Sequence, residues 1–392
     1  MEKILLITLD FFPKIGGVSE YYFNLCEQLA KENHDSIVVL TENTKIQEYK
    51  NIKIPEYDFK IYRKDLSNGF IWPRWLLMFW HIWRVVKKEK IEMFWAGEVL
   101  PTGTAVYCLS KLLKIPYIVS CHGNDILRAR KKWRKEKLAQ RILQAAKWAT
   151  ANSNYTRGLA VDLGVENERV QVVYPGIQLK TQNSKLKTKE ELIKKYNLEN
   201  KKILLSVGRL VERKGFDNVI RALPKVWQEI PELVYLIAGN GSDKERLGKL
   251  SQETLKQFND LTIEQLSGRI IFLGQASMED KEELFSLCDV FIMPARASAD
   301  DVEGFGMVYL EAGSFGKAVI GGRGGGVSEA VVNGETGVLV DGQNVDEIAA
   351  AIIKLFEDDN FRKKLGDNGR RRVEQEFGWE KSVKKFRGLL NC

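Results

Sequence analysis

Short apolar stretches alternate with segments of helical periodicity along this chain, and that alternation strongly limits the folds open to it. Parallel strands need a crossover connection between them, usually a helix, so strands that alternate with helices predict a parallel, doubly wound sheet. In the first half the expected strands are Ile4–Leu9, Ser36–Leu40, Met93–Ala96, Tyr117–Cys121 and Thr150–Ala151. The expected helices are Ser19–Lys31, Pro73–Glu89, Gly103–Leu113 and Arg134–Ala146.

A second set of the same kind follows a polar stretch, Gln178–Asn200, which we expect to be a connector with a short helix. Its expected strands are Ile203–Val207, Val234–Ala238, Ile270–Leu273, Val290–Met293, Ala318–Ile320 and Gly337–Val340. Its expected helices are Phe216–Ile230, Ser242–Phe258, Lys281–Cys288, Val308–Phe315, Val327–Val332, Val345–Glu357 and Trp379–Leu389. A chain of 392 residues is too long for one ordinary core. We therefore expect an α/β protein of two Rossmann-like, doubly wound domains, with ligands in a cleft lined by the carboxyl ends of the strands.

The composition is that of a soluble globular protein, with 44% hydrophobic and 29% charged residues. The start of the chain lacks the apolar core of a signal peptide, and no apolar run reaches the ~18 residues of a spanning helix. A cytoplasmic protein is expected, with peripheral attachment to the inner face of the cell membrane as a further hypothesis. Five scattered cysteines show neither metal-ligand nor disulfide spacing, so buried or inert thiols are predicted: Cys26, Cys108, Cys121, Cys288 and Cys392.

Positive charge is concentrated in the first half of the chain. Residues 1–180 hold 28 Lys and Arg against 19 Asp and Glu, whereas residues 181–392 hold 32 against 33. A field of this kind attracts an anionic partner to one domain. A nucleotide would need only a few positive residues at its binding site. A positive excess over a whole domain therefore favours a larger acidic partner, such as a membrane surface or a phosphorylated lipid.

Two glutamates separated by seven residues mark the most informative stretch, Glu303-Gly-Phe-Gly-Met-Val-Tyr-Leu-Glu311. Its glycines predict a tight loop, and the apolar run after them predicts the start of a helix. A helix N-terminus presents backbone N–H groups and a positive dipole end to an anion. Glu303 is then placed to bind hydroxyls and Glu311 to reach a ribose. The alternative is a helix that merely begins near a glutamate.

This stretch resembles the E-x7-E motif of the retaining nucleotide-sugar glycosyltransferases of the GT-B type, glycosyltransferase family 4. The resemblance covers nearly the whole chain; it is strongest over residues 203–341 and weakest between 41 and 92. It implies an N-terminal acceptor domain at 1–180, a donor domain at 181–378, and a terminal helix, 379–392, that packs back on the first domain. It also implies donor contacts from Phe305, Gly306, Met307 and Val308 beside Glu311.

A second stretch, Ser206 to Asp217, places two cations around the turn between a strand and a helix. The strand is expected to end at Gly208, with Arg209 and Lys214 flanking the turn. A diphosphate leaving group needs positive charge, and Arg and Lys supply it as a planar fork and a compact ammonium. In the family, the matching residues bind the donor diphosphate. The alternative is a pair of solvated surface cations.

Two loops of the first half carry further candidates. Gly16 and Gly17 precede a helix, where glycine lets the backbone approach a ligand closely; in the family this loop closes on the donor phosphates and the acceptor. His122 and Asp125 follow the strand Tyr117–Cys121 and resemble the family's His-Gly-x-Asp segment. His122 can then bond a donor-sugar hydroxyl, and Asp125 can orient the loop or the acceptor. The alternatives are a plain strand–helix turn and a satisfied core histidine.

Glycines also end several expected strands in the second half. The ribbon Gly321–Gly326 invites a dinucleotide interpretation, but no acidic residue lies at the spacing expected for a ribose, so that signal is weak. In the family the ribbon sits beside the donor phosphates and sugar, with Glu329 supporting them from behind. The loops at Gly239 and at Gln275 and Ala276 would border the base and ribose.

The segment from Arg296 to Gly306 most resembles the branch of phosphatidylinositol mannosyltransferases, which use GDP-mannose. The resemblance therefore implies transfer of a hexose, mannose from GDP-mannose by preference, to a lipid-linked or glycan acceptor. Front-side displacement without a protein nucleophile is implied, with His122, Arg209, Lys214 and Glu303 as catalytic residues. No prosthetic group and no metal is expected.

Three alternatives stay open for the function. The chain can instead use a UDP-sugar with a soluble or polysaccharide acceptor, or it can be another sugar-nucleotide enzyme on this fold, such as an epimerase. A non-catalytic nucleotide-sugar-binding module would keep donor affinity but release no nucleoside diphosphate.

Two aromatic and basic segments suggest a membrane surface. Six aromatics lie between residues 70 and 83, namely Phe70, Trp72, Trp75, Phe79, Trp80 and Trp83. The segment 127–137 carries seven basic residues around Trp133; of this segment we assign Arg130, Lys131, Lys132, Trp133 and Arg134 to a headgroup interface. The alternatives are a buried helix for the first segment and a solvated helix for the second. Nucleic acid is not expected as a partner, because the phosphate loops account for a nucleotide-sized ligand.

Overall fold

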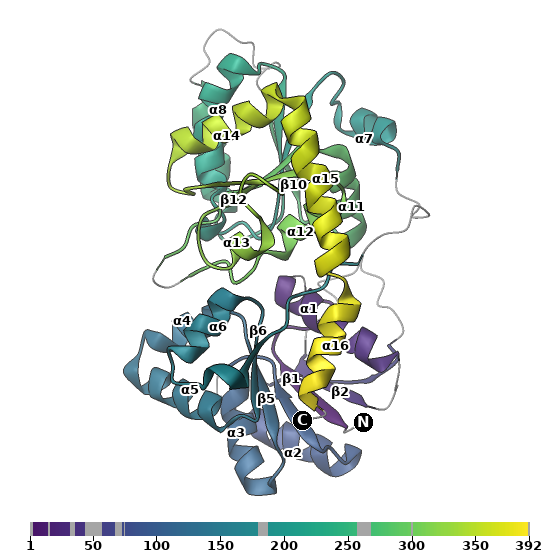
Figure 1. The fold of residues 1–392 in the computed structure, drawn as a ribbon, viewed down its shortest axis with the longest axis vertical. Helices are drawn as coiled ribbons and strands as arrows, with labels where there is room; N and C mark the ends of the chain where they lie inside the picture. The colour runs from purple at the N-terminus through teal and green to yellow at the C-terminus, as the bar shows by residue number, and fades with distance from the viewer. Residues whose placement is uncertain are drawn as a thin grey trace. The chain divides into compact units, whose positions relative to one another are not determined.

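The computed structural model of the protein describes residues 3–14, 16–31, 36–43, 57–66, 73, 75–178, 187–256, 268–298 and 301–390. It divides into two compact units. Unit 1 comprises residues 1–176, 299–304 and 377–392, and unit 2 comprises 177–298 and 305–376. Each unit is a parallel sheet with helices on both faces (Figure 1), so the predicted α/β class of two Rossmann-like folds is confirmed.

The sheet of unit 1 has the strand order β3-β2-β1-β4-β5-β6-β7, and all its pairs are parallel. Its strands are β1 (Ile4–Thr8), β2 (Ile37–Glu42), β3 (Lys60–Lys64), β4 (Met93–Ala96), β5 (Tyr117–Cys121), β6 (Trp148–Ala151) and β7 (Val170–Val172). Two of them, β3 and β7, were not predicted. They are the edge strands, the first mostly polar and the second three residues long, so neither carries a strong apolar signal.

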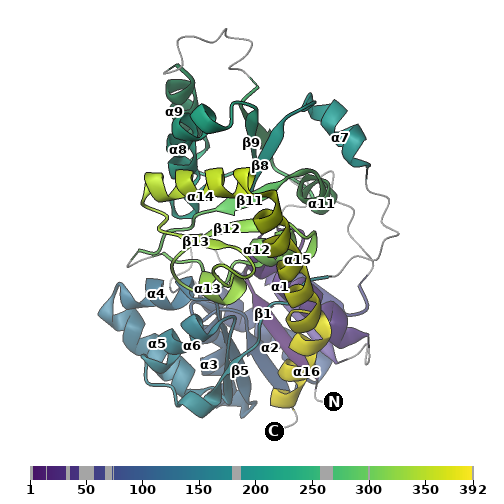
Figure 2. The same cartoon turned by 45° about the horizontal axis from the view of Figure 1, so that its top comes forward.

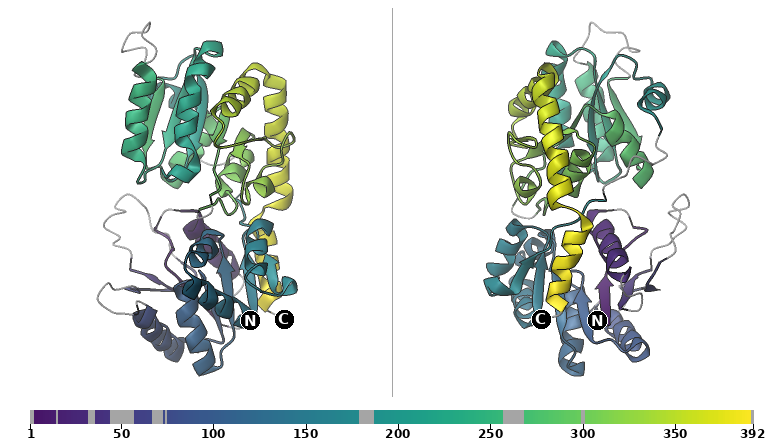
Figure 3. Two further views of the ribbon diagram at one scale, coloured as in Figure 1. Left: turned by 90° about the vertical axis from the view of Figure 1, so that its left-hand side faces the viewer. Right: turned by 45° about the vertical axis from the view of Figure 1, so that its right-hand side comes forward.

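Alternate residues of the unit 1 strands face opposite helical layers, as the period of two in a strand requires. Leu5, Ile7 and Phe94 lie in one core cluster with residues of α2 (Trp75–Glu89), α3 (Thr102–Leu113) and α5 (Trp133–Ala145). On the other face the Trp95 ring lies 4.4 Å, between ring centroids, from Phe386 of α16 (Trp379–Leu390). Helix α16 packs against α1 (Gly17–Ala30), and the two run side by side in Figure 3.

The sheet of unit 2 has the order β10-β9-β8-β11-β12-β13, again all parallel. Its strands are β8 (Lys202–Val207), β9 (Leu233–Ala238), β10 (Ile270–Gly274), β11 (Val290–Met293), β12 (Ala318–Gly322) and β13 (Val338–Val340). Every strand predicted for the second half is found. The buried, β-branched runs identify these strands because both faces of a parallel sheet are covered.

Helices cover both faces of this second sheet (Figure 2). One layer holds α8 (Phe216–Glu229) and α14 (Val345–Glu357), which pack together, with α9 (Lys244–Lys256) beside α8. The other layer holds α11 (Met278–Leu287), α12 (Met307–Ser314) and α15 (Asp359–Glu376), with α7 (Lys189–Tyr196) against α11. The short helix α13 (Val327–Ala330) follows the glycine ribbon.

Helix α15 was not predicted, and its sequence explains why. It is dominated by charged residues and buries few apolar side chains, among them Leu365 and Val373. Close packing comes instead from glycines: a Cβ added to Gly366 would lie 2.0 Å from the carbonyl oxygen of Gly316. Helices α4 (Asn124–Arg130) and α6 (Asn154–Val161) were also missed, because each spans barely two turns.

Some predictions fall on residues outside those described: Phe70, Trp72, Cys392, residues 179–186 of the connector, and the last two residues of the helix expected at Ser242–Phe258. Within the described ranges, no helix combines the length and the apolar character needed to cross a bilayer.

Candidate functional site

In each sheet, the point where the strand order reverses lies next to the first strand of that unit. It falls between β1 and β4 in unit 1, and between β8 and β11 in unit 2. Ligands of doubly wound folds bind beyond the carboxyl ends of the strands at such a point. The predicted site residues follow strands at or beside these points, and they form two groups. We call them the unit 1 half-site and the unit 2 half-site and describe each by itself.

The unit 2 half-site begins with the loop that follows β8. Gly208 N–H donates to the carbonyl of Ala238 at 2.9 Å, which ties the end of β8 to the end of β9. The chain then makes a 3-10 turn at Glu212–Lys214. Lys214 is 9% exposed, and its Cε lies 4.0 Å from the position of a Cβ added to Gly208, while Arg209 is exposed. The fold thus delivers a nearly buried ammonium to the carboxyl end of β8.

A buried carboxylate on α8 braces this turn. Asp217, with its side chain 5% exposed, accepts from Arg296 at 2.5 Å and from Arg221 at 2.8 Å, and Arg246 lies at 3.4 Å. Arg296 also donates to the carbonyl of Glu212 at 2.7 Å. Burial by itself would raise the pKa of Asp217, but the arginines hold that pKa below its ordinary value. Arg221 lies four residues after Asp217 on the same helix, a spacing visible in the sequence, but Arg246 and Arg296 lie on separate segments that local spacing does not connect to Asp217.

The end of β9 requires glycine at Gly239. Its φ is +150°, and an added Cβ would lie 1.8 Å from the carbonyl oxygen of Gly208. Its N–H donates to the carbonyl of Gly274 at 2.6 Å. The next predicted contacts follow β10 directly, with Gln275 exposed and Ala276 half-buried. The loops expected to border a base therefore lie side by side at one edge of the sheet.

The segment after β11 enters α12 through Gly306, whose φ of +92° is left-handed. Phe305 is buried, whereas Met307 and Val308 form the half-buried first turn, whose N–H groups have no partner within the helix. Glu311 lies at the start of the second turn, and its carboxylate pairs with Lys281 Nζ at 3.2 Å. The sequence predicted the helix start to within one residue but not this pair.

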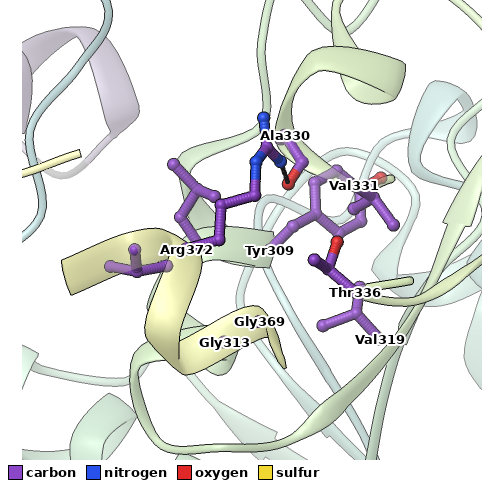
Figure 4. A pocket seen from close by; sticks show the side chains of 10 residues that line it. Tyr309, Gly313, Val319, Ala330, Val331, Thr336, Gly369 and Arg372 are labelled. Atoms are coloured by element: carbon purple, nitrogen blue, oxygen red, sulfur yellow. Dashed lines mark hydrogen bonds between the residues drawn. The ribbon is translucent and has the colours of Figure 1, made fainter. Parts of the chain in front are cut away.

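The ribbon after β12 is supported from behind by Arg372 of α15. Its guanidinium donates to the carbonyls of Glu329 at 2.8 Å and Ala330 at 3.0 Å and so binds the end of α13 (Figure 4). A small pocket lies beside this contact, lined by Tyr309, Thr336 and Val373 among others. These partners fix the position of α13 through its backbone.

The unit 1 half-site is centred on His122, which follows β5. Its Nε2 lies 2.6 Å from the Tyr22 hydroxyl and 3.2 Å from the carbonyl of Gly97, and the Tyr22 hydroxyl donates to that same carbonyl. Burial lowers the pKa of His122, so the ring is neutral at pH 7. With the Tyr22 hydroxyl donating to the Gly97 carbonyl, the tautomer that carries its proton on Nε2 satisfies both of these Nε2 contacts. Nδ1 is then left as an acceptor.

Asp125 acts on the backbone of this loop. Its carboxylate accepts from His122 N–H at 3.0 Å and from Val99 N–H at 3.3 Å. Those contacts join the ends of β4 and β5. Of the two roles considered for Asp125, they support orientation of the loop.

A second carboxyl group, Glu98, lies at the same edge and was not singled out by the sequence. It accepts from the Thr8 hydroxyl at 2.6 Å, Leu9 N–H at 3.1 Å and the Thr102 hydroxyl at 2.9 Å. Burial raises the pKa of Glu98 to about 7, and the nearby charge of Asp10 adds to that rise. A carboxyl residue two positions after a buried strand is the signal that would have identified it.

The loop after β1 ends in Gly16 and Gly17, both exposed at the start of α1. No atom lies within 4 Å of a Cβ added to Gly16, so this loop leaves open space beside its backbone. Lys14 and Asp10 form an ion pair within it.

Glu303 belongs to unit 1 although it lies far along the chain from the other residues of that unit. Val302 N–H donates to Asn124 Oδ1 at 2.8 Å, and Val302 is 1% exposed within the unit 1 core cluster. A Cβ added to Gly304 would lie 2.3 Å from the carbonyl oxygen of His122. Glu303 is therefore flanked on both sides by residues packed against the loop that carries His122. Asp300, at the start of this stretch, lies outside the described residues.

Within the described parts of the chain, no group of three or more His, Cys, Asp or Glu side chains is arranged to hold a metal ion. Cys26, Cys108, Cys121 and Cys288 are free thiols, and burial raises the pKa of Cys288 to about 12. Burial likewise raises the pKa of Cys26 and Cys121, which keeps these thiols protonated and inert.

The basic segment of unit 1 is exposed. Trp133 is 64% exposed at the start of α5, and Arg134 and Lys137 lie 5.3 and 5.4 Å from its ring centroid. Lys131 and Lys132 are exposed too, whereas Arg130 contacts the Leu159 carbonyl and Asp162 of the neighbouring chain segment. Helix α2, which carries most of the other aromatic segment, is only partly buried.

On α2, Leu76 is 47% and Trp80 42% exposed, and the guanidinium of Arg84 lies 3.7 Å from the Trp80 ring centroid. The buried-helix alternative is therefore wrong for these two residues. Amphipathic rings with cations on their faces leave an apolar and basic surface on unit 1.

Two family models match the chain, and together they cover most of it. Residues 188–372 match the model described as glycosyl transferases group 1, and residues 15–181 match that of Glycosyltransferase Family 4. A GDP-mannose-dependent monoacylated alpha-(1-6)-phosphatidylinositol monomannoside mannosyltransferase of Corynebacterium glutamicum is 27% identical, with 99% of this chain and 98% of that protein covered. A GDP-mannose-dependent alpha-(1-6)-phosphatidylinositol monomannoside mannosyltransferase of Mycobacterium tuberculosis is 25% identical, with 100% and 98% covered.

Solved structures share the fold over the same length. Sucrose-phosphate synthase of Thermosynechococcus elongatus superposes with a TM-score of 0.81 at 22% identity, covering 100% of this chain and 98% of that one. HepE of Anabaena, solved in complex with UDP-glucose, gives 0.78 at 20% identity and covers both chains completely.

Proposed function

This chain belongs to glycosyltransferase family 4, and on that premise we propose that it is a retaining hexosyltransferase that uses a nucleoside-diphosphate sugar. The preferred donor is GDP-mannose, and the acceptor is lipid-linked or a glycan. The related mannosyltransferases of Corynebacterium and Mycobacterium are GDP-mannose-dependent, which supports the choice of donor. The single observation that carries the proposal is the nearly buried Lys214 at the reversal point of the unit 2 sheet.

Lys214 and Arg209 supply the charge that a leaving diphosphate needs. Both lie on the loop after β8, and the Asp217–Arg296 brace fixes the turn that carries Lys214. The N–H groups of Met307 and Val308 add the positive end of a helix dipole. Fixed cations and dipoles of this kind stabilise charge that develops as a bond breaks.

In the proposed reaction an acceptor hydroxyl oxygen bonds to the anomeric carbon from the face that the diphosphate leaves. The bond from that carbon to the phosphate oxygen breaks, and the hydroxyl proton passes to the leaving phosphate. No protein nucleophile is needed. His122 accepts a hydrogen bond from a donor-sugar hydroxyl through Nδ1, and Glu303 accepts from other hydroxyls.

The remaining contacts hold the nucleotide. Glu311 bonds the ribose, and Lys281 Nζ, 3.2 Å away, holds its carboxylate in place. The loops at Gly239, Gln275 and Ala276 border the base, and Gly16 and Gly17 approach the donor phosphates through open space. Asp125 holds the His122 loop in place.

The alternative donor is a UDP-sugar with a soluble or polysaccharide acceptor. HepE shares the fold and was solved with UDP-glucose, so the fold by itself does not select the base. A nucleotide-sugar-binding module without transfer is the other alternative.

The first test is the melting temperature of the protein with GDP, UDP, ADP and dTDP separately. A ligand at 100 times its Kd stabilises the folded state by about 2.7 kcal/mol, which is a readable shift. Selective stabilisation by GDP supports the mannosyl donor, and selective stabilisation by UDP replaces it. No shift with any of the four contradicts the phosphate site. Release of nucleoside diphosphate with an acceptor then separates an enzyme from a binding module.

We also propose that the exposed surface of Lys131, Lys132, Trp133 and Arg134 binds an anionic membrane. Tryptophan and basic side chains together suit a headgroup interface, and each basic residue near an anionic surface contributes about 1 kcal/mol. Trp80 and Arg84 on α2 offer a second pair of the same kind in unit 1.

Vesicle sedimentation tests the surface. Replacing Lys131, Lys132, Trp133 and Arg134 together by alanine should abolish binding to phosphatidylglycerol vesicles at low salt. The control variant replaces three exposed lysines of unit 2, Lys249, Lys363 and Lys364, and should bind as the wild type does. Equal binding by both variants would overturn the membrane proposal.

A further inference from the structure

The stretch that contains Asp301–Gly304 belongs to a different unit from the residues that precede and follow it along the chain. The chain on either side of residues 299–304 belongs to unit 2, yet this segment is part of unit 1. Glu303, which the proposed function places against the donor sugar, is therefore carried by the unit that also carries His122. The four described residues show how they are held.

Val302 supplies an apolar anchor. It is 1% exposed and belongs to the unit 1 core cluster, and its Cγ1 lies 3.5 Å from the position of a Cβ added to Gly123. A side chain at Gly123 would therefore meet the valine, and the φ of +89° at Gly123 also favours glycine. Burial of this valine side chain therefore anchors the segment in the core of unit 1.

Asn124 supplies a polar anchor. Its Oδ1 accepts from Val302 N–H at 2.8 Å, across 178 positions of sequence. Gly304 lies against the backbone of His122 and the side chain of Asn152, so close that an added Cβ would lie 2.3 and 3.0 Å from their atoms. Residues 302 and 304 are thus both fixed to the His122–Asn124 loop.

We infer that Asn124 and Val302 are positioning residues for Glu303, and that they set the geometry of the donor-sugar contact from unit 1. This inference rests on the proposed function, in which Glu303 bonds the sugar and Lys214 bonds the diphosphate. It predicts a separation: weakening the anchor impairs recognition of the sugar but leaves recognition of the nucleoside diphosphate intact. Small displacements of a contact group can reduce a rate by orders of magnitude.

The test compares Asn124→Ala with Asn124→Asp. Alanine is tolerated at the first position of a helix but removes the acceptor for Val302 N–H, whereas aspartate keeps an oxygen there. For Asn124→Ala we expect kcat to fall about ten-fold or more and the Kd for GDP to stay within about two-fold. The Kd for GDP-mannose should rise toward that for GDP. Asn124→Asp should recover most of the lost turnover.

Amide hydrogen exchange measures directly whether the hydrogen bond from Val302 N–H to Asn124 is present. The amide of Val302 should exchange faster in Asn124→Ala than in the wild type, and Gly158→Ala, at an open site on α6 of the same unit, should change neither exchange nor turnover. UDP and UDP-glucose are measured in parallel, so the outcome holds for either donor.

The outcomes keep this inference distinct from the proposed function. If the wild type binds no nucleoside diphosphate and transfers no sugar, the proposed function fails, while the exchange measurement still decides whether Asn124 holds Val302. If the wild type is active and Asn124→Ala matches it in turnover, sugar recognition and exchange, this inference is overturned. An equal loss of GDP and GDP-mannose affinity would also overturn it, since that pattern reports general damage.

Discussion

The two half-sites lie at equivalent points of two similar folds, yet their chemistry differs. In unit 2 the loop after β8 carries Arg209 and Lys214, the two cations proposed to bind the diphosphate, and a buried carboxylate with three arginines fixes its turn. In unit 1 the loops after β4 and β5 carry a neutral imidazole and carboxyl groups bound to backbone N–H and hydroxyl donors, and helix α1 adds the Tyr22 hydroxyl beside the imidazole. The fold thus fixes where a ligand can bind, and the loops decide which ligand.

The difference matches the two tasks that the proposed sugar transfer requires. A diphosphate needs fixed positive charge, and unit 2 provides it on a turn held by ion pairs. Sugar hydroxyls need directional acceptors with little net charge, and unit 1 provides them in a hydrogen-bonded network. Four substitutions test this difference between the half-sites.

The largest effect is expected for Lys214→Ala, which removes the nearly buried ammonium. Turnover should fall at least ten-fold, and affinity for the nucleoside diphosphate should fall with it, because the cation stabilises the leaving group. Steady-state kinetics and calorimetric titration measure the two quantities. Lys249→Ala, an exposed lysine of α9, is the control. Wild-type turnover in Lys214→Ala would remove the phosphate assignment.

The next effect concerns the brace of unit 2. Asp217→Asn leaves three arginines without their buried charge partner, and breaking a buried pair in this way destabilises by about 3 kcal/mol. The exposed pair Lys225–Asp346 supplies the control, since Asp346→Asn should change the free energy of unfolding by less than about 0.5 kcal/mol. Denaturant unfolding distinguishes the two. Equal effects would show that Asp217 does not brace the turn.

The pH dependence of this brace has a definite sign. The pKa of Asp217 is lowered in the folded state, so its contribution to stability is present above the ordinary aspartate pKa and is lost as pH falls below it. The stability difference between the wild type and Asp217→Asn should therefore shrink in acid.

The smallest effect is expected at Glu98 in unit 1, and its pH dependence has the opposite sign. The folded-state pKa of about 7 exceeds the ordinary value of 4.5, so the folded protein holds a proton that the unfolded chain releases. Stability contributed at this site is lost as pH rises from about 4.5 to 7. Glu98→Gln should remove this pH dependence. Its free energy of unfolding should exceed that of the wild type by roughly 1–3 kcal/mol between pH 5 and 8.

Glu89 in the same unit is a matched contrast. The Tyr62 hydroxyl, Lys3 and Lys60 surround its carboxylate and hold its pKa at about 2. Its contribution to stability is present above pH 4.5 and should be lost as pH falls from 4.5 toward 2, so Glu89→Gln should be less stable than the wild type at neutral pH and approach it in acid. Identical pH profiles for the two variants would contradict both assignments.

Much of the fold was predictable because it depends on local patterns. Buried strands such as Val290–Met293 are continuous apolar runs, and helices such as Val345–Glu357 carry an apolar stripe, so both were found within a few residues. The edge strands and helix α15 were missed. Their placement depends on pairing partners and on glycine contacts that no local window contains.

Local sequence pattern predicted the alternation that gives two parallel sheets, and it singled out His122 and Lys214 in loops after strands and Glu311 on the helix after β11. Those features follow from short-range periodicity and from the residue types that anions and hydroxyls require. Only the three-dimensional structure shows that Asp217 meets Arg296, that the Tyr22 hydroxyl contacts His122, and that the segment with Glu303 packs on unit 1. Each of these contacts joins residues about 80 to 180 positions apart, and separations of that size leave no trace in local pattern.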